Sequence, residues 1–274
     1  MGLILRLGGV YETRGDSKRL LAITLIFLAA SAACWFGYAA FTKETLDKVT
    51  LCPSKGPRGQ YVVLIDNTSP FPFTQKAAMG QRLKSMVLNE IPEGYLLSVF
   101  LLDEDYKQNE SPIFEKCNPG QWGDKNQYTS SKNFVTRDFN EKFAKPLDAV
   151  VRKISLSGRS KNSPVFEILQ LAGINGFQHS NVQGDKKLVV YSDMMANMPQ
   201  FSMYKGVLPA YPEFRKTSYG HLSVAPGLEG ARVTINLLAA DQKTIPYLKL
   251  TQFWAEYFEA NGASLETIEP MEGL

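Results

Sequence analysis

The feature that most restricts the fold of this chain is an uninterrupted apolar segment that ends in a carboxylate. Residues 60–66 read Gln-Tyr-Val-Val-Leu-Ile-Asp, and Asn-Thr-Ser-Pro follows them. An apolar segment of this length is typical of a strand buried on both faces, as in a parallel sheet. Residues 187–193, Lys-Leu-Val-Val-Tyr-Ser-Asp, have the same design. Because open α/β sheets place ligands beyond the carboxyl ends of their strands, we expect Asp66 and Asp193 to share one site.

The rest of the chain alternates between predicted strands and helices. Helical spacing of apolar residues predicts a helix that Ser163 caps, with Pro164 at its first position. A polar insertion is expected at 103–133, and a short helix at about 201–204 in an otherwise irregular segment. In all, strands are predicted at 61–65, 95–102, 188–191, 231–238 and 263–268, and further helices at about 74–89, 134–154 and 245–261. This alternation predicts an α/β fold with a doubly wound, mainly parallel sheet flanked by helices.

One segment, residues 20–41, has no charged side chain and is long enough to cross a bilayer as a helix. Basic residues dominate the segment before it, which places the N-terminus in the cytoplasm. We therefore predict a cytoplasmic tail (1–19), a transmembrane helix (20–41), a linker (42–59) and an extracytoplasmic domain (60–270). The expected location is a bacterial inner membrane, with the domain on the periplasmic side.

A cleaved signal peptide is the alternative to a membrane anchor. Small residues precede Cys34, which would then be a lipoprotein acceptor. Two features count against cleavage: the residue three positions before it is Ser31 rather than a bulky aliphatic one, and the apolar segment continues beyond Cys34.

The chain has three cysteines, and only Cys52 and Cys117 lie outside the apolar segment. In an oxidising compartment such a pair is a natural disulfide. The bridge would join the start of the first strand to the insertion. Two unrelated buried thiols are the alternative.

Composition excludes two classes of function. A net charge of +3 is too mild to indicate a nucleic-acid binder, and no basic stripe with interleaved aromatic residues is present. The chain has only two histidines, His179 and His221, which excludes a histidine-rich metal site.

Three short segments resemble the von Willebrand factor A domain, and together the match spans about residues 58–270. Asp66-Asn-Thr68-Ser-Pro70 resembles the family's Asp-x-Ser/Thr-x-Ser loop. Gly158, followed by Ser163-Pro, resembles its Gly-x-Thr-Pro turn. Ser-Asp193, after the third predicted strand, resembles the aspartate of its third loop.

The resemblance implies a metal-ion-dependent adhesion site, in which a divalent cation, usually Mg²⁺, binds a carboxylate of a partner. Mg²⁺ prefers hard oxygen ligands and keeps several waters. The implied ligands are Asp66, Thr68, Ser163 and Asp193. Pro70 departs from the family pattern, because it supplies no side-chain oxygen where the family has serine. The alternative is a degenerate site in which both aspartates accept backbone amides or cap helices.

The resemblance further implies a binding module rather than an enzyme. We expect a protein partner within a membrane-associated envelope assembly, such as a secretion, conjugation or surface-structure complex. Ser69, Met194 and Met195 are the candidate partner contacts, because methionines often form adaptable binding surfaces. Packing beneath a loop is the alternative for the methionines.

Two further functions remain open. A metal-dependent phosphoryl hydrolase would use Asp66 and Asp193, and Asp66 also resembles the nucleophile of a haloacid-dehalogenase-like phosphotransferase. Those enzymes have a second acid two residues later, where this chain has Thr68. The other alternative is a metal-free structural scaffold of a membrane complex.

Overall fold

The computed structural model describes residues 14–41, 44–68, 72–102, 110–125, 128, 130–154, 160–178, 182, 184–238 and 245–271. The chain forms two compact units, Met1–Thr45 and Leu46–Leu274. The first contains helix α1 (Arg14–Phe41). Within the described residues, α1 is the one helix long and apolar enough to cross a membrane, over Leu21–Tyr38. Its large apolar side chains are exposed all round, as in a helix that lipid would surround.

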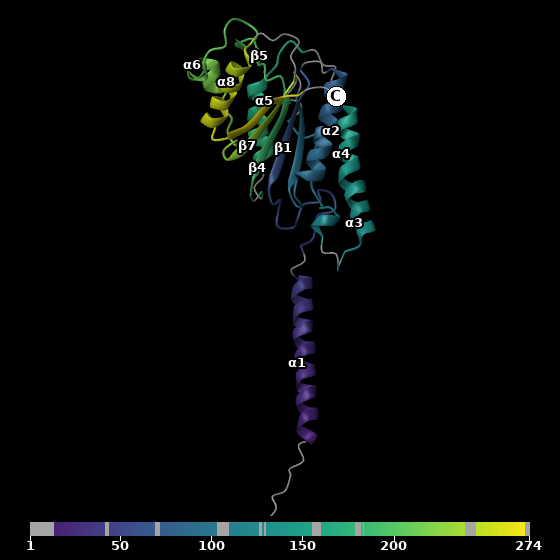
Figure 1. The fold of residues 1–274 in the computed structure, drawn as a ribbon. Helices are drawn as coiled ribbons and strands as arrows, with labels where there is room; N and C mark the ends of the chain where they lie inside the picture. Colours follow the sequence, from purple (N-terminus) through teal and green to yellow (C-terminus); the bar gives the residue numbers. More distant parts are fainter. Residues whose placement is uncertain are drawn as a thin grey trace, which may run out of the picture. The chain divides into compact units, whose positions relative to one another are not determined.

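The second unit is built on a six-stranded sheet in the order β3-β2-β1-β4-β7-β8 (Figure 1). All neighbours pair in parallel except β3, which runs antiparallel to β2. The α/β fold with a mainly parallel sheet is therefore confirmed. The strands are β1 (Gln60–Asp66), β2 (Leu96–Leu102), β3 (Phe114–Cys117), β4 (Lys186–Ser192), β7 (Ala231–Leu237) and β8 (Ser264–Pro270).

Helices cover both faces of the sheet (Figure 1). Over one face lie α2 (Phe73–Asn89) and a continuous helical rod, residues 132–153, made of α3 (Lys132–Phe139), the π-helical segment η2 (Asn140–Ala144) and α4 (Lys145–Lys153). Over the other lie α5 (Val165–Leu171) with the π-helical segment η3 (Ala172–Phe177), α6 (Tyr211–Arg215), α7 (Ser218–Leu222) and α8 (Tyr247–Ala260).

Alternate side chains of the central strands supply both cores. Val62 and Leu64 face α5 and α8, whereas Val63 and Ile65 face α2. This two-sided burial explains why β1 is continuously apolar. The aromatic face of α8 packs around Phe166, whose ring stacks on Phe214 at 5.0 Å. This face therefore belongs to the core.

The described part of the predicted insertion, 103–133, contains β3 and a short 3₁₀ helix, η1 (Trp122–Asp124). Two local predictions were wrong. Residues 201–204 form no helix; β6 (Phe201–Ser202) pairs there with β5 (Asn197–Met198). Ser163 does not cap α5, which begins at Val165 after Pro164. Pro146 is the second residue of α4, and the rod continues through it.

A disulfide joins Cys52 to Cys117, as predicted. It connects the segment before β1 to the last residue of β3. The third cysteine, Cys34, is exposed on α1 and is not bonded to another cysteine.

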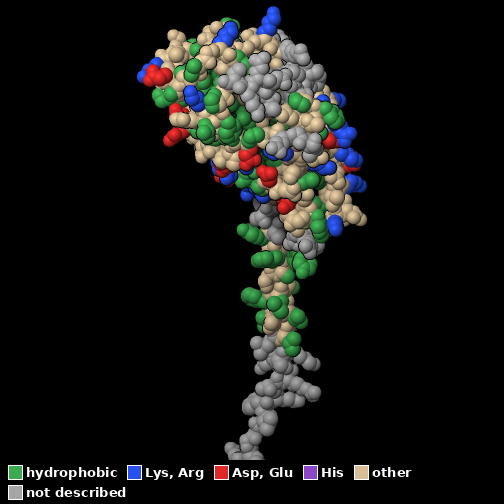
Figure 2. Space-filling model, turned by 45° about the horizontal axis from the view of Figure 1, so that its top comes forward, with side chains coloured by type: hydrophobic (Ala, Val, Ile, Leu, Met, Phe, Trp, Pro, Cys, Tyr) green, Lys and Arg blue, Asp and Glu red, His purple; other side chains and the backbone are tan. Residues whose placement is uncertain are grey.

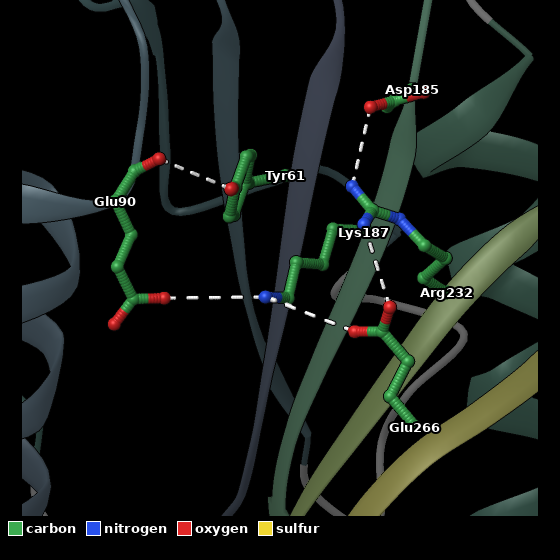
Figure 3. A network of polar contacts seen from close by, with 6 residues as sticks. All are labelled: Tyr61, Glu90, Asp185, Lys187, Arg232 and Glu266. Atoms are coloured by element: carbon green, nitrogen blue, oxygen red, sulfur yellow. Dashed lines mark hydrogen bonds and ion pairs between the residues drawn. The ribbon is translucent and has the colours of Figure 1, made fainter.

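A charged network lies where the parallel strands begin (Figure 3). Lys187 lies 4.0 Å from both Glu90 and Glu266, and Arg232 contacts Glu266 at 3.4 Å and Asp185 at 3.2 Å. At this edge of the sheet, each of the three carboxylates faces a cation. Such partly exposed pairs add little stability, about 0–1 kcal/mol each.

Candidate functional site at the carboxyl ends of the strands

The opposite edge of the sheet brings together five polar side chains, which we call the polar cluster: Asp66, Thr68, Ser163, Ser192 and Asp193. Strands β1 and β4 are parallel neighbours, with Ile65 aligned to Tyr191. The next residue of each strand is therefore polar and at the same height. Accordingly, Asp66 Oδ2 accepts a hydrogen bond from Ser192 Oγ at 2.6 Å.

The turn after β1 places Thr68 over the same carboxylate. Asp66 Oδ1 accepts hydrogen bonds from the Thr68 amide at 2.8 Å and the Thr68 hydroxyl at 2.7 Å. This is an Asx turn, in which a side-chain oxygen replaces a backbone acceptor. The hydroxyl oxygens of Thr68 and Ser163 lie 3.2 Å apart. Three of the four predicted ligands thus lie in direct contact.

Ser163 is held in place by the small β5–β6 hairpin. Its amide donates to the Asn197 carbonyl at 2.8 Å, and the Asn197 amide donates back to the Ser163 carbonyl at 2.9 Å. The Asn197 side chain also donates to the Lys161 carbonyl at 2.8 Å. The hairpin therefore fixes the segment before α5 beside the ends of the strands.

The fourth predicted ligand, Asp193, is buried and has two hydrogen-bond donors of its own. Its Oδ1 accepts from the Met195 amide at 2.9 Å, and its Oδ2 accepts from the Tyr204 hydroxyl at 3.0 Å. Burial, and then the nearby Asp193 carboxylate, raise the pKa of Tyr204 well above its ordinary value. Tyr204 therefore remains a neutral donor to Asp193 at physiological pH.

The backbone beside Asp193 is strained. Met194 has a φ of +56°, a conformation that side-chain-bearing residues rarely adopt. Its amide donates to Ser192 Oγ at 2.9 Å, and its carbonyl accepts from Trp254 Nε1 at 3.1 Å. Such outliers persist only where surrounding contacts hold them, and they concentrate at functional sites.

The methionines do not form the expected contact surface. Met194 and Met195 are 0% and 3% exposed and pack in the core between β4 and α8. This burial argues against their assignment as partner contacts and favours the alternative, packing beneath a loop. The third candidate contact, Ser69, lies outside the described residues, as do Pro70 and Gly158.

The charge of Asp66 is poorly compensated. Within the described part of the chain, its hydrogen-bond donors are the neutral groups of Thr68 and Ser192. Burial is the main cause that raises its pKa, and the hydrogen bonds from Ser192 and Thr68 oppose it. This contrasts with the network in Figure 3, where acids face cations. A cation near Asp66 would favour its charged form.

Two unpaired polar atoms flank the polar cluster. Among the described residues, Asn67 Oδ1 and Ser160 Oγ are buried without a hydrogen-bond partner. Ser160 is adjacent to the cluster, because its amide donates to the Thr68 carbonyl at 3.0 Å. Buried polar atoms of this kind call for an explanation, such as a water or an ion.

The oxygen atoms of the polar cluster suit a hard cation rather than a soft one, which prefers sulfur or nitrogen ligands. Described residues contain no group of three or more His, Cys, Asp or Glu placed to hold a metal. The cluster instead offers carboxylate and hydroxyl oxygens, the ligand type that Mg²⁺ takes together with water. Sequence reasoning missed Ser192 and Tyr204. A polar residue at the end of β4 was a signal for Ser192, whereas no local pattern marks Tyr204.

Fold and site together define a class: an α/β protein with a doubly wound, mainly parallel sheet, a polar cluster at the strand ends and one N-terminal helix able to span a membrane. No family model and no curated protein sequence matches the chain.

Two solved structures show what the chain is similar to. Proximal thread matrix protein 1 from the mussel byssus is 12% identical, with a TM-score of 0.39, over 72% of this chain and 41% of that one. An aerotolerance-related membrane protein from Bacteroides fragilis, crystallised with multiple mutations to serines, is 10% identical, with a TM-score of 0.35. The similarity covers 76% of this chain and 90% of that one. The chain thus spans less than half of the mussel protein. Similarity at this level says nothing about function.

Proposed function

We propose that this protein is a membrane-anchored module that binds a protein partner through the polar cluster, in the manner of a von Willebrand factor A domain. The observation that carries the proposal is the convergence of Asp66, Thr68 and Ser163 with Asp193 at one edge of the sheet. These residues come from three separate loops of the chain. Ligands of open α/β sheets bind at this edge.

We propose that α1 spans a membrane with its N-terminus in the cytoplasm. The Leu46–Leu274 unit then lies on the extracytoplasmic side. Basic residues before the apolar segment support this orientation. The Cys52–Cys117 disulfide supports it independently, because disulfides persist in oxidising compartments such as the bacterial periplasm. An envelope assembly, such as a secretion, conjugation or surface-structure complex, is the setting that these features favour.

The residues that would hold a divalent cation are Asp66, Thr68, Ser163 and Asp193, and Mg²⁺ is the ion that their oxygens favour. When bound, the ion would supply a positive charge that a carboxylate of the partner can coordinate. The buried carboxylate of Asp66, with its raised pKa, is the group that such a charge would stabilise most. Ser192 and Tyr204 would orient the two aspartates.

The test is titration of the full-length chain, in neutral detergent, with Mg²⁺ and with Mn²⁺, followed by calorimetry and thermal unfolding. We expect saturable stabilisation of about 2.7 kcal/mol at a hundredfold excess over Kd. Asp66→Asn removes the carboxylate at nearly constant shape and should abolish this response. Asp185→Asn, at the opposite edge of the sheet, is the matched control and should respond like the parent.

The other outcomes are informative. No response in any protein would contradict metal binding and favour the metal-free scaffold. A response that persists in Asp66→Asn would place the ion elsewhere. Metal-dependent turnover of an aryl phosphate that disappears in Asp66→Asn would identify a phosphoryl hydrolase instead.

A further inference from the structure

An apolar groove of about 560 Å³ separates α2 from the helical rod 132–153. Leu83 and Val87 from α2 and Leu147 from α4 form its buried floor. Val151 extends this apolar surface along the rod. A groove of this size lies within the range, roughly 300–1,000 Å³, that proteins use to bind ligands. Residues of α2 and of the rod line the groove, and none of them belongs to the polar cluster, so the two sites share no residue.

The groove is lined by small residues where α2 faces the rod. Ala77 and Gly80 come from α2, and Ala144 comes from the rod. A Cβ added to Gly80 would meet nothing within 4 Å. Packing within the described chain therefore does not require glycine here, although glycine in a helix costs about 1 kcal/mol relative to alanine. A missing Cβ at this point lets another backbone approach closely.

Basic side chains surround the groove. Lys76, Lys84, Lys145 and Arg152 line it, together with one acid, Asp148. Two of these cations have a partner on the rod: Arg152 pairs with Asp148 at 2.8 Å, and Lys145 pairs with Glu141 at 2.5 Å. Helix α2 contains three basic residues and no acidic one. Lys84 is exposed and forms no ion pair within the described part of the chain. Lys and Arg side chains dominate the right-hand edge of the globular unit in Figure 2, the side on which α3 and α4 lie in Figure 1.

We propose that this groove docks an acidic amphipathic helix of a partner protein. A groove between two helices accepts the ridge of a third helix, and apolar side chains at i, i+3, i+4 and i+7 would fill it. Acidic side chains on the flanks of that helix would face the basic rim, which fixes its register and excludes basic competitors. Helix α2 has 17 residues and is about 25 Å long, so a partner segment of about 16 residues would match it.

The test uses the full-length chain in nanodiscs of neutral lipid and a display library of random 16-residue peptides. Selection is paired with counter-selection against Gly80→Leu, which fills the groove. We expect enrichment of peptides with net negative charge and helical apolar spacing. Synthetic copies should bind Gly80→Leu at least tenfold more weakly than the parent chain. The double variant Lys84→Glu/Lys145→Glu, which leaves the floor intact, should show a similar loss.

Matched controls separate groove binding from general charge. Lys55→Glu/Lys249→Glu makes the same charge change on exposed lysines outside the groove and should leave affinity within about twofold, and Gly80→Ala should weaken binding less than Gly80→Leu. Circular dichroism verifies that each variant is folded. Failure to enrich any peptide, enrichment of basic peptides, or full binding by Gly80→Leu would overturn the proposal. So would tight binding to phosphatidylglycerol vesicles that the peptides do not displace, or a Gly80-dependent dimer.

Discussion

Asp66 is the residue at which burial and charge conflict most directly. Its carboxylate is 3% exposed and, within the described chain, faces only neutral donors. Removing a carboxylate from water disfavours its charged form, which is why burial raises the pKa of Asp66. A protein can tolerate this cost at a binding site, where a cation or a partner restores the balance.

The pH dependence of stability tests this conflict without added metal. A carboxyl group with a raised folded-state pKa stabilises the protein fully below its unfolded value of 3.8, and the stabilisation is lost as pH rises through the folded-state pKa. Each pKa unit between the folded and the unfolded state changes the free energy of unfolding by about 1.4 kcal/mol. Asp66→Asn should therefore flatten the decline in unfolding free energy that begins as pH rises above the unfolded-state value of 3.8. Denaturant unfolding at a series of pH values, with a chelator present, measures this free energy for both proteins.

Asp185→Asn again serves as the control, because this carboxylate lies at the opposite edge of the sheet beside Arg232. The unfolding free energy of Asp185→Asn should decline with rising pH as it does in the parent chain. Parallel pH profiles for the parent and Asp66→Asn would show that Asp66 titrates normally, and would remove the electrostatic argument for a cation.

At the scale of elements, helix α8 and strand β4 jointly hold the loop that carries Asp193. The Trp254 indole reaches from α8 to the carbonyl of Met194, the residue with a positive φ. A helix distant in sequence thus maintains the backbone of the candidate site. The small β5–β6 hairpin does the same for Ser163. Both supports act through backbone groups, so neither uses a side-chain oxygen of the polar cluster.

Trp254→Phe should destabilise this loop more than its change in volume suggests. The substitution keeps an aromatic ring but leaves the buried Met194 carbonyl without its donor, which costs about 1–3 kcal/mol. We also expect faster hydrogen exchange at the Met195 amide, which bonds to Asp193. Phe253→Leu, a buried neighbour on α8, should lower stability without accelerating that amide. Unchanged exchange in Trp254→Phe would mean that the indole does not hold the loop.

At the scale of the whole molecule, a chain of this kind combines an apolar helix with an independently cored α/β unit. The two contrast in burial: α1 exposes its apolar side chains, whereas β1 is buried at every position. Within the α/β unit, the disulfide ties the segment before β1 to the edge strand β3. An edge strand has a neighbouring strand on one side only. The bridge therefore gives β3 a covalent attachment in addition to its pairing with β2.

Removing the bridge should lower the free energy of unfolding substantially. Cys52 and Cys117 are 65 residues apart, and constraining a loop of that length in the unfolded chain is worth about 4 kcal/mol. Cys52→Ser/Cys117→Ser, or reduction with dithiothreitol, should show this loss in denaturant titrations. Cys34→Ser, which affects only a cysteine outside the bridge, should not. Equal stability of the oxidised and reduced chains would contradict the structural role assigned to the bridge.

The sequence by itself determined the elements whose pattern is strong and local. Strands β1 and β4 were predictable because burial on both faces leaves a continuous apolar segment. Helix α1 was predictable because its apolar segment is long and carries no charge. The positions of Asp66 and Asp193 followed from the same strands. The pairing of Cys52 with Cys117 was one of two alternatives, because spacing alone does not bring two thiols together.

Only the tertiary structure decided the features that join distant parts of the chain. Strand β3 is four residues long with two charged residues at its centre, and it exists because β2 offers a hydrogen-bonding edge. Met194 and Met195 are buried because α8 packs against their loop. The Tyr204 hydroxyl reaches Asp193 because of the β5–β6 hairpin, which no periodicity of the sequence predicts. In each case the decisive partner lies elsewhere in the sequence, so packing and backbone hydrogen bonding, rather than local pattern, set the outcome.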